Sequence, residues 1–92
     1  MTDELLLLRA ETYRSASSYH RAAGRYFDSL RPHHVTTGHR SEVVREYLDA
    51  GQTYGVALET LIAYLLTNES ESPELERARR ITFLLEYEMS LI

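Results

Sequence analysis

Three of the four histidines in this sequence lie close together, within the stretch 32–40. His33, His34 and His39 carry imidazole rings, which are common ligands of zinc and nickel. The sequence places no carboxylate beside them, and neighbouring histidines rarely turn toward the same metal ion. We therefore interpret the stretch as a titratable surface loop, and we expect neither a metal nor any other cofactor.

The fourth histidine, His20, follows Arg14 by six positions in the run Arg-Ser-Ala-Ser-Ser-Tyr-His. An arginine and a histidine at about this distance on a helix resemble the signature of HEPN-type ribonucleases, which are all-helical and often dimeric. The resemblance covers seven residues. It implies general acid–base catalysis on RNA by His20 and stabilisation of negative charge by Arg14. The chain is short for that family, and the polar residue that follows Arg14 is not distinctive.

His20 also has a structural interpretation, because it falls on the apolar stripe of the expected first helix. There its ring would pack in the core and find a partner in a tyrosine or a backbone group. A short motif without its structural context does not define a site. We therefore predict no catalytic residue and keep Arg14 and His20 as candidate binding residues.

Arginine is the only strongly basic residue type, and it is concentrated in the middle of the chain. The sequence has ten arginines and no lysine, and residues 14–45 contain six arginines against two acids. Guanidinium groups bind phosphates and carboxylates through several donors. Tyr13, Tyr19 and Tyr26 are interleaved with them, and tyrosine rings can stack on bases. The candidate contacts with a nucleic acid or an acidic partner are Arg14, His20, Arg21, Arg25, Arg31, Arg40 and Arg45.

The balance of charge argues against a nucleic acid as the main partner. The formal net charge of the chain is −4, and residues 46–92 contain nine acids against three arginines. No recognised nucleic-acid-binding motif is present, and the acidic last helix could neutralise the arginines within the molecule or across a dimer. Nucleic-acid binding, with or without ribonuclease activity, is therefore the alternative function.

The sequence also excludes several classes of chemistry. It contains no cysteine, which rules out disulfides, cysteine-ligated zinc and a thiol nucleophile. The apolar run 5–8 is too short for a secretory signal or for a membrane span, which needs about 20 apolar residues. We find no glycine-rich phosphate loop and no Ser–His–Asp arrangement. We expect a cytoplasmic protein and do not expect an enzyme or a membrane partner.

Long helices must position all of these side chains, because only two prolines and four glycines interrupt the chain. The spacing of apolar residues predicts helices over 3–31, 42–67 and 73–91. Each predicted helix follows a residue that can cap it, namely Thr2, Ser41 or Ser72. Short connections between long helices favour antiparallel neighbours. The sequence thus predicts one all-α domain over residues 1–92, an antiparallel up-down-up three-helix bundle.

Each predicted helix carries an apolar stripe with three–four spacing, which should face the core. The first stripe is Leu6, Tyr13, Ala16, His20, Ala23, Phe27 and Leu30. The second is Val44, Tyr47, Gly51, Tyr54, Leu58, Leu61 and Leu65. The third is Leu75, Ala78, Thr82, Leu85, Met89 and Ile92. Gly51 and Gly55, four residues apart, permit a close approach of a neighbouring helix.

Two segments, 5–8 and 81–92, have more apolar residues than one stripe needs. A helix that is apolar on every side is buried on every side, and in an up-down-up bundle these segments lie at opposite ends. A second copy of the chain is the expected cover, since two-fold dimers are the commonest oligomers. We therefore expect a protein-interaction module (an adaptor, regulator or assembly subunit) that forms a homodimer or larger oligomer. The predicted interface residues are Leu5, Leu8, Ile81, Leu84, Tyr87 and Leu91.

Overall fold

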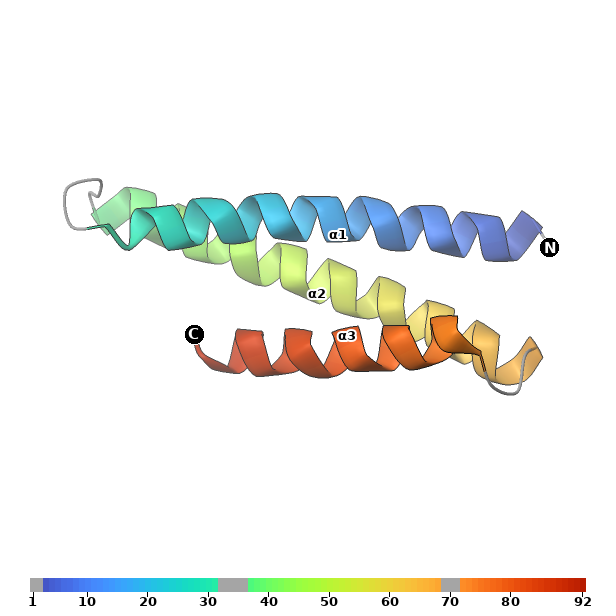
Figure 1. Cartoon of the computed structure of the whole chain (residues 1–92). Helices are drawn as coiled ribbons and strands as arrows, with labels where there is room; N and C mark the ends of the chain where they lie inside the picture. Colours follow the sequence, from blue (N-terminus) through green and yellow to red (C-terminus); the bar gives the residue numbers. More distant parts are fainter. Residues whose placement is uncertain (1–2, 32–36, 69–71) are drawn as a thin grey trace.

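The computed structural model describes residues 3–31, 37–68 and 72–92, with side chains from residue 41 onward in the second range. Within these residues the chain forms three helices and no strand. The helices are α1 (Asp3–Ser29), α2 (Thr37–Asn68) and α3 (Pro73–Ser90). They run in alternating directions, with α2 crossing between α1 and α3 (Figure 1). The predicted all-α, up-down-up three-helix bundle is confirmed.

The helix ends follow from local chemistry in α1 and α3. Asp3 and Glu4 occupy the first turn of α1, where the helix dipole favours negative charge. Ser72 caps α3, because its Oγ accepts a 3.1 Å hydrogen bond from the Leu75 amide. Pro73 takes the first helical position, where its missing N–H costs nothing. The predicted start of the third helix is therefore confirmed.

The start of α2 differs from the sequence prediction. The helix begins at Thr37, five residues before the predicted position 42, so Ser41 lies inside the helix and is not its cap. Gly38 is the only poor helix former between 37 and 41. One glycine costs about 1 kcal/mol in a helix, which the rest of this 32-residue helix can offset. His39 and Arg40, which were predicted in the loop, therefore lie in α2.

α2 is the central element, because α1 and α3 both pack against it. Its buried residues take part in two core clusters that lie along its length. The larger cluster contains Tyr19, Ala23, Tyr47, Tyr54, Leu58, Ala78 and Leu85. The smaller cluster contains Leu5, Leu61, Leu65 and Leu75. The bundle is long and flat, with Cα extents of 49 × 23 × 14 Å.

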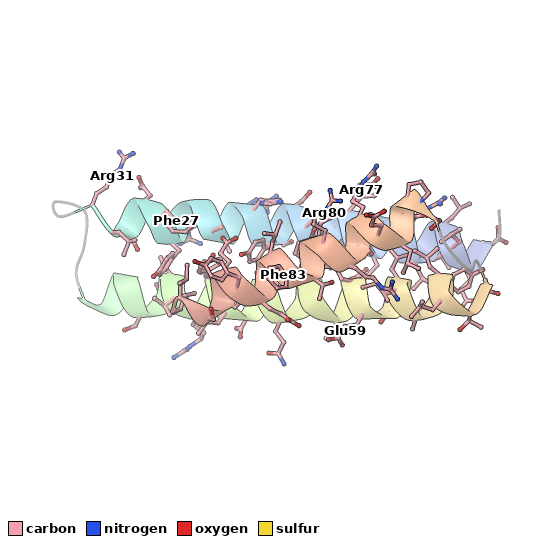
Figure 2. The ribbon with its side chains drawn as sticks, turned by 60° about the horizontal axis from the view of Figure 1, so that its bottom comes forward. Phe27, Arg31, Glu59, Arg77, Arg80 and Phe83 are labelled. Carbon is pink, nitrogen blue, oxygen red and sulfur yellow. The ribbon has the colours of Figure 1, made fainter. Side chains whose placement is uncertain are left out.

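α3 lies obliquely across the other two helices (Figure 2). At its start, Arg9 of α1 donates two hydrogen bonds to the Glu74 carboxylate, at 2.7 and 2.5 Å. Near its end, Met89 packs on α2 and occupies the space that a β-carbon at Gly51 would need. The second half of α3 therefore lies against α2 and moves away from α1. The predicted close approach is found at Gly51.

The buried face of α1 is not the one that the sequence predicted. Buried positions are Leu5, Ser15, Tyr19, Ala22, Ala23 and Ser29, while most of the predicted stripe is exposed, namely Leu6, Tyr13, His20, Phe27 and Leu30. The two stripes are offset by one residue, which is about 100° around a helix. The buried stripe has small residues, which let α1 approach α2 closely. The oblique path of α3 leaves the other stripe uncovered.

Candidate functional site

The inner side of α3 is held firmly in the bundle, which fixes the direction of its outer side. Leu75, Ala78 and Leu85 are buried in the two core clusters. The Tyr47 hydroxyl donates a 2.5 Å hydrogen bond to Glu88 Oε1. These contacts span the length of the helix, so its opposite side must face away from the bundle.

The outer side of α3 carries four large apolar side chains over its last three turns. Their exposed fractions are 70% for Phe83, 54% for Leu84, 61% for Tyr87 and 68% for Leu91. Leu84, Tyr87 and Leu91 follow three–four spacing, so they form one edge of the helix. We call these four residues the α3 patch. Exposed apolar patches on small proteins commonly mark interaction sites.

The α3 patch includes three of the six predicted interface residues. Leu84, Tyr87 and Leu91 are exposed as an interface requires, and Ile81 is half-buried. Phe83 was not among the predicted interface residues, although it is the most exposed member of the patch. Its position, four residues before Tyr87, would have placed it on the same side of the helix.

The predicted interface at the start of α1 is wrong at Leu5, which is only 5% exposed. α1 and α3 start at the same end of the bundle, so Leu5 packs with Leu65 of α2 and Leu75 of α3. Leu8 is half-buried against the same cluster. The end of the bundle thus covers Leu5 and much of Leu8 without a second copy, while Leu6 and Leu7 are exposed.

Three of the six candidate arginines form ion pairs with acids of the same chain. Arg14 Nη1 lies 2.9 Å from Glu11 Oε2, and Arg31 Nε lies 3.5 Å from Asp28 Oδ1. A third ion pair joins α1 to α2, between Arg25 and Glu46. Arg21 and Arg45 are exposed, and the side chain of Arg40 lies outside the described part of the chain. The acids on α1 and α2 therefore compensate much of the basic middle segment.

The three interleaved tyrosines do not form a surface for base stacking. Tyr19 is buried between the helices, and its ring lies 5.4 Å from the ring of Tyr47. Tyr26 is half-buried and also stacks near Tyr47, at 4.8 Å. Only Tyr13 is strongly exposed. Two of the three rings thus belong to the core between α1 and α2.

Arg14 and His20 are not brought together. Six residues at roughly 100° each place them about 120° apart around α1. Arg14 donates a hydrogen bond to Glu11. His20 is exposed, and the centroid of its ring lies 5.6 Å from that of Tyr19 in an edge-to-face arrangement. His20 is therefore not the core residue that the apolar stripe predicted. Tyr19, one position earlier, takes that place.

In the histidine stretch 32–40, the structure describes the backbone of residues 37–40, which belongs to α2. His33 and His34 lie outside the described residues, and the side chain of His39 is likewise not described. Among the side chains that are described, no three His, Asp or Glu groups are close enough to share a metal ion.

A network of hydrogen-bonded polar side chains between the helices was not predicted from the sequence. The Tyr19 and Tyr47 hydroxyl oxygens are 3.1 Å apart, and Tyr47 donates its only hydroxyl hydrogen to Glu88. Tyr19 must therefore donate to Tyr47. Burial, followed by the hydrogen bond to Glu88, raises the pKa of Tyr47 to about 12. Burial also raises the pKa of Tyr19. This network connects all three helices, through Tyr19 of α1, Tyr47 of α2 and Glu88 of α3.

The fold and the α3 patch define a class of structure, a three-helix bundle with one apolar face open. Comparisons with protein-family models, with curated proteins and with solved structures found no match. No helix in the described residues is long and apolar enough to cross a membrane.

Proposed function

We propose that this chain is a helical protein-interaction module that associates with itself through the α3 patch. It would serve as an adaptor, a regulator or an assembly subunit, in the cytoplasmic location expected from the sequence. One observation carries the proposal: Phe83, Leu84, Tyr87 and Leu91 are each more than half exposed on a helix whose other side is locked into the core.

The composition of the patch supports a protein partner. Aromatic and leucine side chains at the centre of an interface gain about 25 cal/mol for each Å² of apolar surface that leaves water. Aromatic residues are enriched in such interfaces, and tyrosine is among the commonest energetic hot spots. The patch offers Phe83 and Tyr87 within one turn of each other. A second helix laid along α3 would cover both rings.

A nucleic-acid partner has less support. Arg14, Arg25 and Arg31 are paired with acids, and Tyr19, which could have stacked on bases, is buried. The formal net charge of −4 would repel a phosphate backbone at long range. We therefore treat nucleic-acid binding as an outcome that the experiment below would reveal.

The test is the molar mass of the purified protein, measured by size-exclusion chromatography with light scattering and with absorbance at two wavelengths. We expect an oligomer without nucleic acid. Replacing Leu84 or Leu91 with Asp should give a folded species of smaller mass, because a carboxylate cannot enter an apolar interface without a large desolvation cost.

The matched control is Leu66→Asp on α2, since Leu66 is 50% exposed and Leu84 is 54% exposed. This control should keep the wild-type mass. A monomeric wild-type protein, or an equal loss of mass with Leu66→Asp, would refute self-association through α3. Bound nucleic acid that salt removes would favour the alternative function.

A further inference from the structure

The outer side of α3 carries positive charge before Phe83 and negative charge after it. Arg79 and Arg80 precede Phe83 by one turn, while Glu86 and Tyr87 follow it by one turn. Residues three or four positions apart lie on the same side of a helix. The face centred on Phe83 therefore runs from basic to acidic along the helix.

Two of these charges have no partner inside the bundle. Among the described residues, neither Arg79 nor Glu86 forms an ion pair, and both are exposed. They cannot pair with each other, because seven residues of helix separate them by about 10 Å. Arg80 lies 3.6 Å from Glu76 at the surface, a contact that is loose and exposed. Arg79 and Glu86 are thus available to another molecule.

We infer that a second copy of this chain docks its α3 antiparallel to the first, with the two helices crossing at Phe83. This inference rests on the self-association proposed above and specifies its geometry. In the pair, Phe83 packs on Phe83 of the second copy. Arg79 of each copy faces Glu86 of the other, and the Arg80 guanidinium of each lies on the Tyr87 ring of the other, where a cation is attracted to the aromatic face.

One two-fold axis satisfies all of these contacts together. The midpoint between Arg79 and Glu86 and the midpoint between Arg80 and Tyr87 each lie within one residue of Phe83. In a two-fold interface, a contact from residue i to residue j is repeated from j to i. Each pair is therefore formed twice around the same axis. A parallel arrangement would instead place Arg79 against Arg79 and Glu86 against Glu86.

The surface around the crossing point is open. Phe83 lies in the foreground of the bundle, on the middle of α3, with Arg77 and Arg80 on the preceding turns (Figure 2). α3 has 18 residues, about 27 Å at 1.5 Å per residue. One helix of this length makes an interface near the small end of the range for specific complexes. We therefore expect a dimer that dissociates on dilution.

The test is a charge-reversal cycle, read as the dimer dissociation constant from analytical ultracentrifugation. Arg79→Glu and Glu86→Arg, each alone, place like charges opposite each other twice per dimer. We expect each single change to raise the dissociation constant about tenfold or more. The double variant Arg79→Glu/Glu86→Arg restores opposite charges in the same geometry, and its dissociation constant should return to within about threefold of the wild type.

The matched controls are Arg45→Glu and Glu42→Arg, which make the same changes in net charge at exposed positions of α2. They should leave dimerisation unchanged. If the single α3 changes have no effect while Leu84→Asp abolishes the dimer, the antiparallel pairing is wrong and self-association through the patch stands. If the double variant is as weak as the single variants, the pairing is also wrong. If the wild type is a monomer, both proposals fail.

Discussion

The Tyr47 hydroxyl bonds to Glu88 Oε1 at 2.5 Å and thereby fastens the second half of α3 to α2. The same hydroxyl accepts the hydrogen bond from Tyr19 of α1. No described side-chain polar atom that is fully buried lacks a partner. The network therefore stabilises the packing of the second half of α3 on α2. Because Glu88 faces α2, the residues of the α3 patch on the opposite side of the helix face solvent.

Removing the central hydroxyl should destabilise the fold. Tyr47→Phe keeps the ring in the core but leaves Glu88 and the Tyr19 hydroxyl without their partner. We expect a loss of about 1–3 kcal/mol in the free energy of unfolding, the usual cost of unsatisfied buried polar groups. Urea denaturation followed by circular dichroism measures this. Tyr87→Phe, which removes an exposed hydroxyl from α3, should change stability by less than about 0.5 kcal/mol, and an equal loss there would contradict the role of the network.

Stability should fall at high pH because of the same tyrosines. The pKa of Tyr47 is raised from 10.0 to about 12, and that of Tyr19 is raised as well. A raised pKa means that the folded state holds its proton more tightly than the unfolded state. The resulting stability is complete below about pH 10 and is lost as pH rises toward 12, by up to about 1.4 kcal/mol per pH unit for each tyrosine. Urea denaturation at pH 9 and at pH 11 should show this fall, and Tyr47→Phe should make it less steep.

The ion pair between Arg9 and Glu74 should matter at low pH. The hydrogen bonds from Arg9 lower the pKa of Glu74 below its ordinary value of 4.5. A lowered pKa contributes stability above that ordinary value, and the contribution is lost as the carboxylate is protonated at lower pH. Glu74→Gln should therefore reduce stability by about 1 kcal/mol at pH 7 and by less at pH 3. A constant difference between the two pH values would contradict this role.

The helical glycines should respond differently to alanine. Alanine is favoured over glycine in a helix by about 1 kcal/mol. A β-carbon at Gly24 would meet nothing within 4 Å, and one at Gly55 would lie 3.7 Å from Leu85 Cδ2, an ordinary contact. Gly24→Ala and Gly55→Ala should therefore raise the melting temperature. Gly51→Ala must displace Met89 and should gain less or lose stability, and an equal gain at all three positions would show that Met89 does not constrain the fold.

The corrected position of Leu5 can be tested directly. Leu5→Ala removes a buried side chain from the cluster with Leu61, Leu65 and Leu75, and we expect a loss of about 2–4 kcal/mol in the free energy of unfolding. Leu7→Ala changes an exposed leucine two residues away and should have almost no effect. Denaturation curves that placed the larger loss at Leu7 would mean that the start of α1 is packed on its other side.

The sequence by itself determined the helices and much of two core faces. The Ser72–Pro73 pair set the start of α3, because a hydroxyl cap and a proline without an N–H satisfy the first turn. In α2 the three–four spacing predicted Tyr47, Leu58 and Leu65 in the core, and they are buried there. It also selected Val44, which is half-buried, over its neighbour Val43, which is fully buried.

The tertiary structure decided what spacing left open. α1 has apolar residues on two adjacent sides. α2 approaches closely on the side where α1 has small residues, and this places Tyr19 and not His20 in the core. The partners Arg9 and Glu74 are 65 positions apart, and Tyr47 and Glu88 are 41 apart, so no local pattern could pair them. The path of α3 depends on those contacts. The exposure of Phe83 follows from that path, since the direction of a helix face is set only when the rest of the bundle packs against its opposite side.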